Sequence, residues 1–392
     1  MFKKIPYNKA FVNKKDINIV KKSLKTQILT SGPYLNNLEY NFQKKLNVKN
    51  SIACNSGTSA LHLAFKSLNI KKSDIVILPI INFVAASNML SLLGVKIYYA
   101  DVDNLTGQMT PQTLKECIKK NKIKKIKAFV TMYLGGSPDN VVEFYKIKKK
   151  LKCYLIEDAC HALGASYKYK NKSYEIGSCK HSDICTFSLH PLKSITSGEG
   201  GIVCTNNSLL AKNIKKIRSH GIQKNKKDGH WVYDVSEPGY NFRISEMNCA
   251  LALSQLDKLD SFINLRKKIS TQYINFFKSF EHLLKVRPCN SMDQNAWHLF
   301  VILVDFKKFK ISKNDFFKYL LKKGIICQQH YMPLYEFSYY SHINRKNFIN
   351  SSAYINSAIS IPIYFELKKS KIKYICQIIK NFLTQNIIKD GI

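Results

Sequence analysis

Arginine is scarce in this sequence. Only positions 218, 243, 266, 287 and 345 carry it, although lysine and arginine together number 62 and the formal net charge is +36. Proteins that recognise nucleic-acid phosphates or bases commonly use the bidentate guanidinium group of arginine. The lysine runs, for example 119–120 and 148–150, are dispersed and have no aromatic residues between them. We therefore interpret the charge as a solvated lysine-rich surface. A non-catalytic protein that binds nucleic acid or a membrane is the alternative, and an anionic small substrate fits both.

Long apolar segments are also absent. The longest runs, such as residues 75–81, are too short to span a bilayer, and the N-terminal stretch MFKKIPYNKAF lacks the apolar core of a secretory signal. The 11 cysteines form no CxxC pair and show no metal-ligand spacing, so we expect buried free thiols and no metal site. These features predict a cytoplasmic protein that binds neither a membrane nor nucleic acid.

Short apolar runs alternate with helical patterns through the first part of the chain. A chain of 392 residues with 45% hydrophobic residues is long enough for two domains with substantial cores. Helices are predicted over 58–70 and 83–93. Strands are predicted over 51–55, 74–80, 96–103, 126–133 and 153–159. This alternation predicts an α/β fold with a mostly parallel central sheet that helices cover on both sides.

The pattern changes towards the C-terminus. Residues 1–35 are predicted to form an N-terminal arm with a helix that begins at Asp16, and a long amphipathic helix is predicted from 245 towards 280. Shorter mixed elements follow it, which indicates a smaller α+β unit. We place the division near residue 260. Residues 1–260 would then form the arm and the large domain, and residues 261–392 the small C-terminal domain.

Two strand ends carry candidate functional groups. Residues 55–59 (NSGTS) lie between a predicted strand and a predicted helix, where amides, hydroxyls and the helix N-terminus would suit a phosphate. A plain helix cap is an equal alternative. Glu157 and Asp158 end an apolar strand at the sheet edge where functional groups collect, and their side chains must point to opposite faces. Two solvated acids that cap a helix, with His161 as a core partner, are the alternative.

Lys193 lies in a third stretch, TFSLHPLKSITSGEGGIV (residues 186–203), between two predicted strands. In such a glycine-rich loop a lysine can lose its solvent, which lowers its pKa and makes its amine a usable nucleophile. An ordinary surface lysine is the alternative for any single lysine of this chain. Together the three stretches offer a phosphate site, a carboxylate for a pyridinium nitrogen and an amine for an imine. Those are the groups that pyridoxal phosphate needs.

The chain resembles the sugar aminotransferases of the DegT/DnrJ/EryC1/StrS family over nearly its full length. The resemblance rests on many motifs in one order: LTSGP (29–33), NSGTSALHLA (55–64), PIINFVAASNML (79–90), EDACHALGA (157–165), TFSLHPLKSITSGEGG (186–201), RSHGI (218–222), GYNFRISEMNCALALSQL (239–256), QQHYMPLYEFSYY (328–340) and AISIPIY (358–364). It implies fold type I of the pyridoxal-phosphate-dependent transferases and the cofactor pyridoxal 5′-phosphate.

The resemblance also implies roles for individual residues. Lys193 would be the catalytic lysine that binds the cofactor and moves protons between cofactor and substrate, and Asp158 would pair with the pyridinium nitrogen. Phe83 would stack on the ring, and His161 would lie beside its hydroxyl side. The phosphate would be bound by Gly57, Thr58, Ser59, Ser188 and, from the neighbouring subunit, Asn241. A homodimer with shared active sites is therefore implied.

Within the family, the segments IPYN (5–8), EDACHALG (157–164) and GIICQQHYMPLYEF (324–337) are similar to one branch. That branch aminates C4 of a UDP-linked 4-keto-6-deoxy-N-acetyl sugar in pseudaminic acid synthesis, with glutamate as the amino donor. The likeness implies a substrate site that comprises Tyr7, Gln27, Thr30, Gln328, His330, Tyr331 and Tyr335, with His298 as a further candidate. Another 3- or 4-aminotransferase of the same family, acting on a dTDP- or GDP-sugar, is the alternative.

Overall fold

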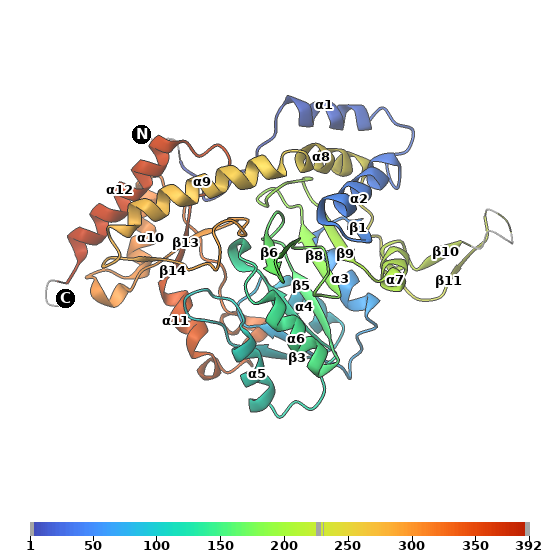
Figure 1. The fold of residues 1–392 in the computed structure, drawn as a ribbon, viewed down its shortest axis with the longest axis horizontal. Helices are drawn as coiled ribbons and strands as arrows, with labels where there is room; N and C mark the ends of the chain where they lie inside the picture. Colours follow the sequence, from blue (N-terminus) through green and yellow to red (C-terminus); the bar gives the residue numbers. More distant parts are fainter. Residues whose placement is uncertain (1–3, 225–228, 230, 389–392) are drawn as a thin grey trace.

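A seven-stranded sheet forms the centre of the computed structural model, which describes residues 4–224, 229 and 231–388 (Figure 1). The strand order is β1-β9-β8-β5-β4-β2-β3. The strands are β1 (Asn50–Cys54), β2 (Ile75–Pro79), β3 (Lys96–Ala100), β4 (Ala128–Met132), β5 (Tyr154–Asp158), β8 (Ile184–Ser188) and β9 (Gly201–Thr205). From β3 to β8 all neighbours are parallel, whereas β9 is antiparallel to both β8 and β1. The prediction of a mostly parallel sheet is confirmed.

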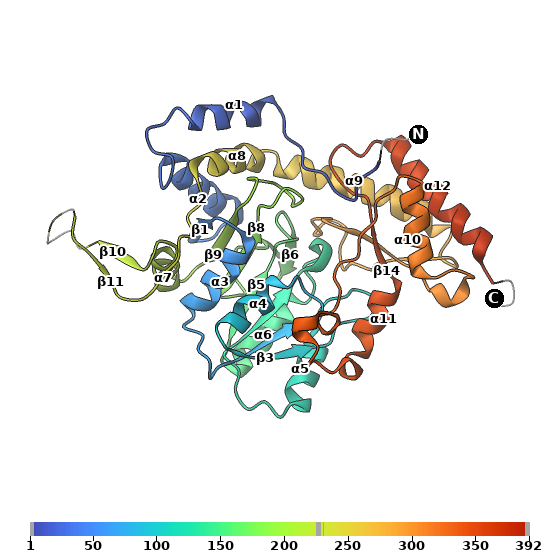
Figure 2. The same cartoon turned by 180° about the vertical axis from the view of Figure 1, so that it is seen from behind.

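Helices cover both faces of this sheet, as the two views in Figures 1 and 2 show. They are α2 (Pro33–Leu46), α3 (Gly57–Ser67), α4 (Ala85–Leu92), α5 (Pro111–Lys120), α6 (Val141–Leu151), α7 (Ser208–Arg218) and α8 (Glu246–Leu256). The side chains of neighbouring residues in β9 pack on opposite faces of the sheet. Ile202 packs in a cluster with residues of α2 and α8, and Val203 packs in a cluster with residues of α3 and α7. Burial on both faces explains why the central strands are nearly continuous apolar runs.

The C-terminal part has a sheet and a core of its own. Its antiparallel strands are β12 (Lys285–Val286), β13 (Phe300–Leu303) and β14 (Ala358–Ile361), and its helices are α9 (Leu259–Lys278), α10 (Lys313–Lys322), α11 (Ile349–Ser357) and α12 (Lys369–Asn386). Tyr273, Phe300 and Phe316 are fully buried in the cluster that joins α9, α10 and α12 to this sheet. α9 begins at Leu259, and the division of the chain near residue 260 stays a prediction.

The long helix predicted from residue 245 is interrupted. α8 ends at Leu256 and α9 begins at Leu259, and the N–H of Lys258 donates to the carbonyl of Gln255 at 3.0 Å. That bond closes a tighter turn than an α-helix has, which separates the two helices. The break directs the Lys258 side chain towards the N-terminal arm.

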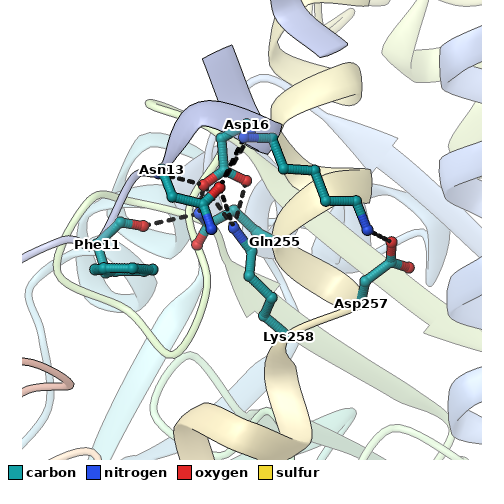
Figure 3. Close-up of polar contacts among 7 residues, drawn as sticks. Phe11, Asn13, Asp16, Gln255, Asp257 and Lys258 are labelled. Carbon is teal, nitrogen blue, oxygen red and sulfur yellow. Dashed lines mark hydrogen bonds and ion pairs between the residues drawn. The ribbon is translucent and has the colours of Figure 1, made fainter. Parts of the chain in front are cut away.

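The N-terminal arm is fixed to this break. Its helix α1 (Lys14–Ser23) lies alongside α8 (Figure 1). Asp16 is fully buried, and its carboxylate accepts hydrogen bonds from Nζ of Lys258 at 2.5 Å and from Nε2 of Gln255 at 3.0 Å (Figure 3). The arm is therefore an integral part of the fold, and it leads the preceding residues along the C-terminal unit.

Smaller elements complete the fold. Two hairpins are formed by β6 (Ser166–Tyr169) with β7 (Lys172–Glu175) and by β10 (Ile222–Lys224) with β11 (Tyr233–Val235). The second hairpin projects from the rest of the molecule (Figure 1). Single 3₁₀ turns occur at Leu134–Gly136, Phe306–Lys308, Leu334–Glu336, Ser338–Tyr340 and Arg345–Asn347. Within residues 4–224, 229 and 231–388, no helix has the length and apolar character needed to cross a membrane.

Candidate active site

A cavity of about 430 Å³ lies where β5 and β8 end, between the sheet and the C-terminal unit. This edge is where open α/β sheets position their ligand sites. The predicted residues that the cavity brings together are Tyr7, Gly57, Thr58, Phe83, Asp158, His161, Ser188, Lys193, His298, His330 and Tyr331. They come from the arm, from the central sheet with its helices and from the C-terminal unit, so the site depends on all three.

The two adjacent carboxylates at the end of β5 point to opposite faces. Asp158 lines the cavity, whereas Glu157 accepts hydrogen bonds from the hydroxyl of Tyr133 at 2.6 Å and the hydroxyl of Ser182 at 2.9 Å. Both carboxylates are buried, so neither is a solvated helix cap. Burial raises the pKa of the Asp158 carboxyl. Only Asp158 can therefore present a buried acid to a ligand in the cavity.

Lys193 lies in the tight loop between β8 and β9. Its backbone N–H donates to the carbonyl of His190 at 2.9 Å, and the hydroxyl of Thr196 donates to the carbonyl of Leu189 at 3.1 Å. Burial lowers the pKa of the Lys193 ammonium, and the nearby carboxylate of Asp158 partly opposes this effect. A lowered pKa increases the fraction of neutral amine, which is the nucleophilic and proton-accepting form.

The connection from β1 to α3 meets the end of β8 at the cavity. Ser56 is the N-cap of α3, since its hydroxyl accepts the N–H of Ser59 at 3.0 Å. Gly57 and Thr58 follow it and line the cavity. A Cβ at Gly57 would lie 2.7 Å from the Cβ of Ser188, a distance that requires glycine or a shift of the neighbour. Helix-terminal amides beside the hydroxyls of Thr58 and Ser188 form an arrangement that suits a phosphate.

Three histidines form a neutral polar wall. His161, His298 and His330 are all buried, and burial lowers the pKa of His330 to about 3 and that of His161 well below its ordinary value. Nδ1 of His161 accepts the N–H of Gly135 at 3.3 Å. The proton of the neutral ring is therefore on Nε2, which lies 2.9 Å from the hydroxyl oxygen of Tyr331 and donates to it.

Aromatic side chains flank the mouth of the cavity. The Phe83 side chain is half exposed, and its ring centroid lies 5.6 Å from that of Tyr331. The ring centroid of Tyr7 lies 5.5 Å from that of His330. A flat ligand that entered the cavity would therefore meet an exposed ring face at Phe83.

Some predicted residues lie outside this cavity; they are Gln27, Thr30, Ser59, Asn241, Gln328 and Tyr335. The hydroxyl of Ser59 belongs to the cap of α3, and Asn241 is exposed. Tyr335 is the clearest departure. Its ring is buried and stacks on Phe348, and its hydroxyl lies 2.9 Å from that of Ser352. In this structure Tyr335 is a core residue and not part of the cavity wall.

Cys160 and Glu199 are among the lining residues that were not singled out from the sequence. Cys160 donates its N–H to the carboxylate of Asp158 at 3.1 Å, and Glu199 reaches the cavity from the glycine-rich loop. Both lie inside the motifs that contain Asp158 and Lys193, and this proximity in the sequence could have marked them as candidate site residues. Their side chains add a thiol and a carboxylate to the site.

The donor set fits pyridoxal phosphate. The close approach of Gly57 to Ser188 leaves a cradle that a Cβ would fill, beside two hydroxyls. Asp158 offers a buried carboxylate for a ring nitrogen, and Lys193 offers an amine of lowered pKa. These are the interactions through which proteins hold this cofactor and tune its electronics.

Comparison with known proteins gives one consistent result. The model of the DegT/DnrJ/EryC1/StrS aminotransferase family matches residues 11–380. A UDP-4-amino-4,6-dideoxy-N-acetyl-β-L-altrosamine transaminase of Campylobacter jejuni subsp. jejuni is 35% identical over 372 residues, which cover 95% of both chains.

Solved structures agree with this match. Helicobacter pylori PseC, an aminotransferase involved in the biosynthesis of pseudoaminic acid, has a TM-score of 0.88 and 28% identity, and the match covers 98% of this chain and 100% of that one. Spr1654 of Streptococcus pneumoniae in its PMP form has a TM-score of 0.89 and 23% identity, with 97% and 99% covered. At 23% identity, the likeness to Spr1654 shows the fold alone.

Proposed function

This chain belongs to the DegT/DnrJ/EryC1/StrS aminotransferase family, and from that premise we propose that it aminates a UDP-linked 4-keto sugar. The acceptor would be UDP-2-acetamido-2,6-dideoxy-β-L-arabino-hex-4-ulose, and glutamate would supply the amino group. The product would be the 4-amino sugar that gives the Campylobacter jejuni relative its name. The pathway would be that of pseudaminic acid, in which the Helicobacter pylori protein acts.

The observation that carries the proposal is the cavity that Lys193 and Asp158 share. An amine of lowered pKa and a buried carboxylate line one cavity next to the N-terminus of α3. Transamination needs an amine that takes up and returns a proton, and a carboxylate that keeps a pyridine nitrogen protonated. We propose pyridoxal 5′-phosphate as the cofactor on this ground.

Each residue then has a defined task. The carboxylate of Asp158 would hold a proton at the ring nitrogen, and the amides of Gly57 and Thr58 would bind the phosphate. Nζ of Lys193 would take a proton from the reacting carbon of glutamate and pass it to the bound cofactor, and in the second half-reaction it would pass a proton from the cofactor to C4 of the sugar. Phe83 would cover one ring face and limit the access of water. Bound pyridoxal phosphate supplies the electron sink for this chemistry.

The substrate and the assembly complete the proposal. Tyr7, His330 and Tyr331 line the part of the cavity that the arm and the C-terminal unit form, and we assign the sugar to this side. Asn241 is exposed and outside its own cavity, which supports a homodimer in which it reaches the neighbouring site. The free cysteines of the described chain support a reducing, cytoplasmic location.

The decisive experiment uses both C5 epimers of the UDP-4-keto sugar. Purified protein with pyridoxal phosphate and L-glutamate is incubated with each epimer, and the products are identified by mass spectrometry and NMR. We expect amination of the β-L-arabino sugar. Turnover of the D-xylo epimer alone would refute the proposed sugar and leave the family unchanged.

A lysine pair tests the assignment of the site. Lys193→Ala should lose the visible absorption of the bound cofactor and nearly all activity. Lys212→Ala, which removes an exposed lysine of α7, should behave as wild type. Equal behaviour of the two variants would contradict the role of Lys193.

A further inference from the structure

The N-terminal arm places two adjacent side chains on different sides of the active site. The carbonyl of Tyr7 accepts the N–H of Ile363 at 2.9 Å, which fixes the arm against the C-terminal unit. The Tyr7 side chain lines the cavity. The side chain of the next residue, Asn8, is buried and contacts the backbone of the Lys193 loop instead.

Arg266 of α9 is a buried cation beside Asn8. Its Nη1 donates to the carbonyls of Trp297, His298 and Ile363 at 3.4, 3.2 and 3.1 Å, and its Nη2 donates to Oδ1 of Asn8 at 3.1 Å. Burial lowers its pKa to about 10, so the guanidinium stays charged at neutral pH. No carboxylate of the described chain forms an ion pair with it, and these neutral oxygens must stabilise the charge.

Two donors determine how the Asn8 amide is oriented: the guanidinium of Arg266 and the N–H of Lys9, which donates to Oδ1 of Asn8 at 2.8 Å. Arginine can only donate, so Asn8 must turn its oxygen to Arg266 and its NH₂ group away from it. That NH₂ group donates to the carbonyl of Leu192 at 2.7 Å. This carbonyl and the N–H of Lys193 belong to one peptide unit, and the N–H is bound by the carbonyl of His190 at 2.9 Å. Both polar groups of that unit are therefore held.

The arm has separate anchors beyond Asn8. Nε2 of Gln255 donates to the carbonyl of Phe11 at 2.8 Å, and Asp16 forms its ion pair with Lys258 (Figure 3). These contacts hold the arm against α8 and α9 without any contribution from Asn8. A change at Asn8 should therefore act on the Lys193 loop and leave the arm in place.

We propose that Asn8 is a positioning residue that fixes the peptide unit of Lys193 and thereby aims the lysine side chain into the cavity. Arg266 and the N–H of Lys9 set the direction of the Asn8 amide. The inference rests on the proposed function, because it takes Lys193 as the cofactor lysine. In this proposal Asn8 positions Lys193, whereas the preceding residue, Tyr7, faces the substrate side of the cavity.

Two substitutions separate the contacts that Asn8 makes. Asn8→Asp keeps an acceptor for Arg266 and gives it a counter-charge, but it has no N–H for the carbonyl of Leu192. Asn8→Ala removes both contacts, and with them the bond that Oδ1 accepts from the N–H of Lys9 at 2.8 Å, which Asn8→Asp can keep. Lys9→Ala is the matched control, since Lys9 pairs with Glu366 at the surface. For each protein we would measure the Tm without cofactor, the affinity for pyridoxal phosphate by equilibrium dialysis, and the rate at which L-glutamate removes the visible absorption.

The proposal predicts that stability and lysine positioning respond differently. Asn8→Asp should keep or raise the wild-type Tm, whereas Asn8→Ala should lower it. Both should bind pyridoxal phosphate about tenfold more weakly and react with glutamate about tenfold more slowly, because the lysine is misplaced. Lys9→Ala should match wild type in all three measurements.

Two results would overturn the proposal. One is wild-type cofactor affinity and rate in Asn8→Asp, which would show that the bond to Leu192 is not needed. The other is a fall in Tm in Asn8→Asp as large as in Asn8→Ala, which would contradict the amide orientation. These measurements would stay valid if the proposed sugar were wrong, because none of them uses the sugar. The incubation with the two epimers tests the sugar separately. Failure of the proposed cofactor would show in the wild-type protein itself.

Discussion

Nε2 of His161 lies 2.9 Å from the hydroxyl oxygen of Tyr331, although 170 residues separate them in the sequence. The bond joins the loop after β5 to the C-terminal unit inside the candidate active site. Because Gly135 binds the other ring nitrogen, the imidazole of His161 is held at both ends. The plane of this ring, and with it one wall of the cavity, depends on a contact between the two units.

Removal of the Tyr331 hydroxyl tests this contact. Tyr331→Phe leaves the N–H of buried His161 without a partner, so the free energy of unfolding should fall by about 1–2 kcal/mol. Urea unfolding followed by circular dichroism measures the change. Tyr339→Phe, at a side chain that is 70% exposed, is the control and should leave stability unaltered. An unchanged midpoint in Tyr331→Phe would show that the bond contributes nothing.

The buried ion pair of the arm predicts a pH-dependent loss of stability. Burial alone would raise the pKa of Asp16, but hydrogen bonds, first that of Lys258, outweigh it and the pKa is lowered from 3.8. The stability that this carboxylate provides is therefore complete above the unfolded value and is lost as the pH falls through the folded value. Asp16→Asn should cost roughly 2–4 kcal/mol at neutral pH, and the cost should shrink below pH 3.8.

Figure 3 also contains the control for that experiment. Asp257 pairs with Lys15 at 2.9 Å, but both side chains are more than 60% exposed, at 63% and 64%. Asp257→Asn should therefore change stability by less than about 0.5 kcal/mol at any pH. Equal effects of the two substitutions would mean that the burial of Asp16 has no energetic consequence.

Glu246 caps a helix that is distant in sequence. Its fully buried carboxylate accepts the backbone N–H groups of Gly32, Tyr34 and Leu35 at 2.9, 2.6 and 3.1 Å, at the N-terminus of α2. Glu246→Gln removes the charge that favours these donors, and thermal unfolding should show a loss of about 1–3 kcal/mol. Glu143→Gln, at the exposed N-terminus of α6, should cost only a few tenths. A small effect at Glu246 would refute its role as a cap.

Local pattern predicted the sheet and the centre of the site. Runs buried on both faces are visible as strands without any knowledge of their neighbours, and strand alternation separates Glu157 from Asp158. Asp158 is the last residue of β5 and Lys193 follows β8, and the ends of these two parallel strands meet at one edge of the sheet. The combination of the three stretches indicated their chemical roles, and the family resemblance implied the same roles.

Contacts made by the arm and the C-terminal unit could not be predicted in this way. Asn8 meets Leu192 across 184 residues, and Glu246 meets Gly32 across 214. No local period or propensity encodes such pairs, because they depend on how complete units pack. Tyr335 shows that a shared motif does not place every member in the site. His330 and Tyr331 of the same motif line the cavity, whereas the ring of Tyr335 packs in the core against Phe348.

The pKa of Glu157 predicts how stability changes with pH. Burial raises it above the ordinary value of 4.5, while hydrogen bonds from Tyr133 and Ser182 act against this. The folded protein thus holds a proton that the unfolded chain has lost, and stability falls as the pH rises through the folded value. Glu157→Gln cannot ionise, so its stability relative to wild type should improve as the pH rises above 4.5 and should level off once the folded carboxyl of the wild type has ionised. Glu116→Gln, an exposed control, should show no such trend.

Substitution of the neighbouring acid, Asp158, should change the reaction rate. Asp158→Asn removes the only carboxylate of β5 that lines the cavity, and an amide cannot keep a ring nitrogen protonated. The rate of reaction with L-glutamate should fall about a hundredfold. The free energy of unfolding should change by less than the activation free energy of this reaction. Glu157→Gln, one residue away on the other face, should keep the wild-type rate because its partners Tyr133 and Ser182 lie away from the cavity. Stopped-flow absorbance would measure both variants. Equal losses in the two would mean that burial at the strand end, and not the direction of one carboxylate, governs the reaction.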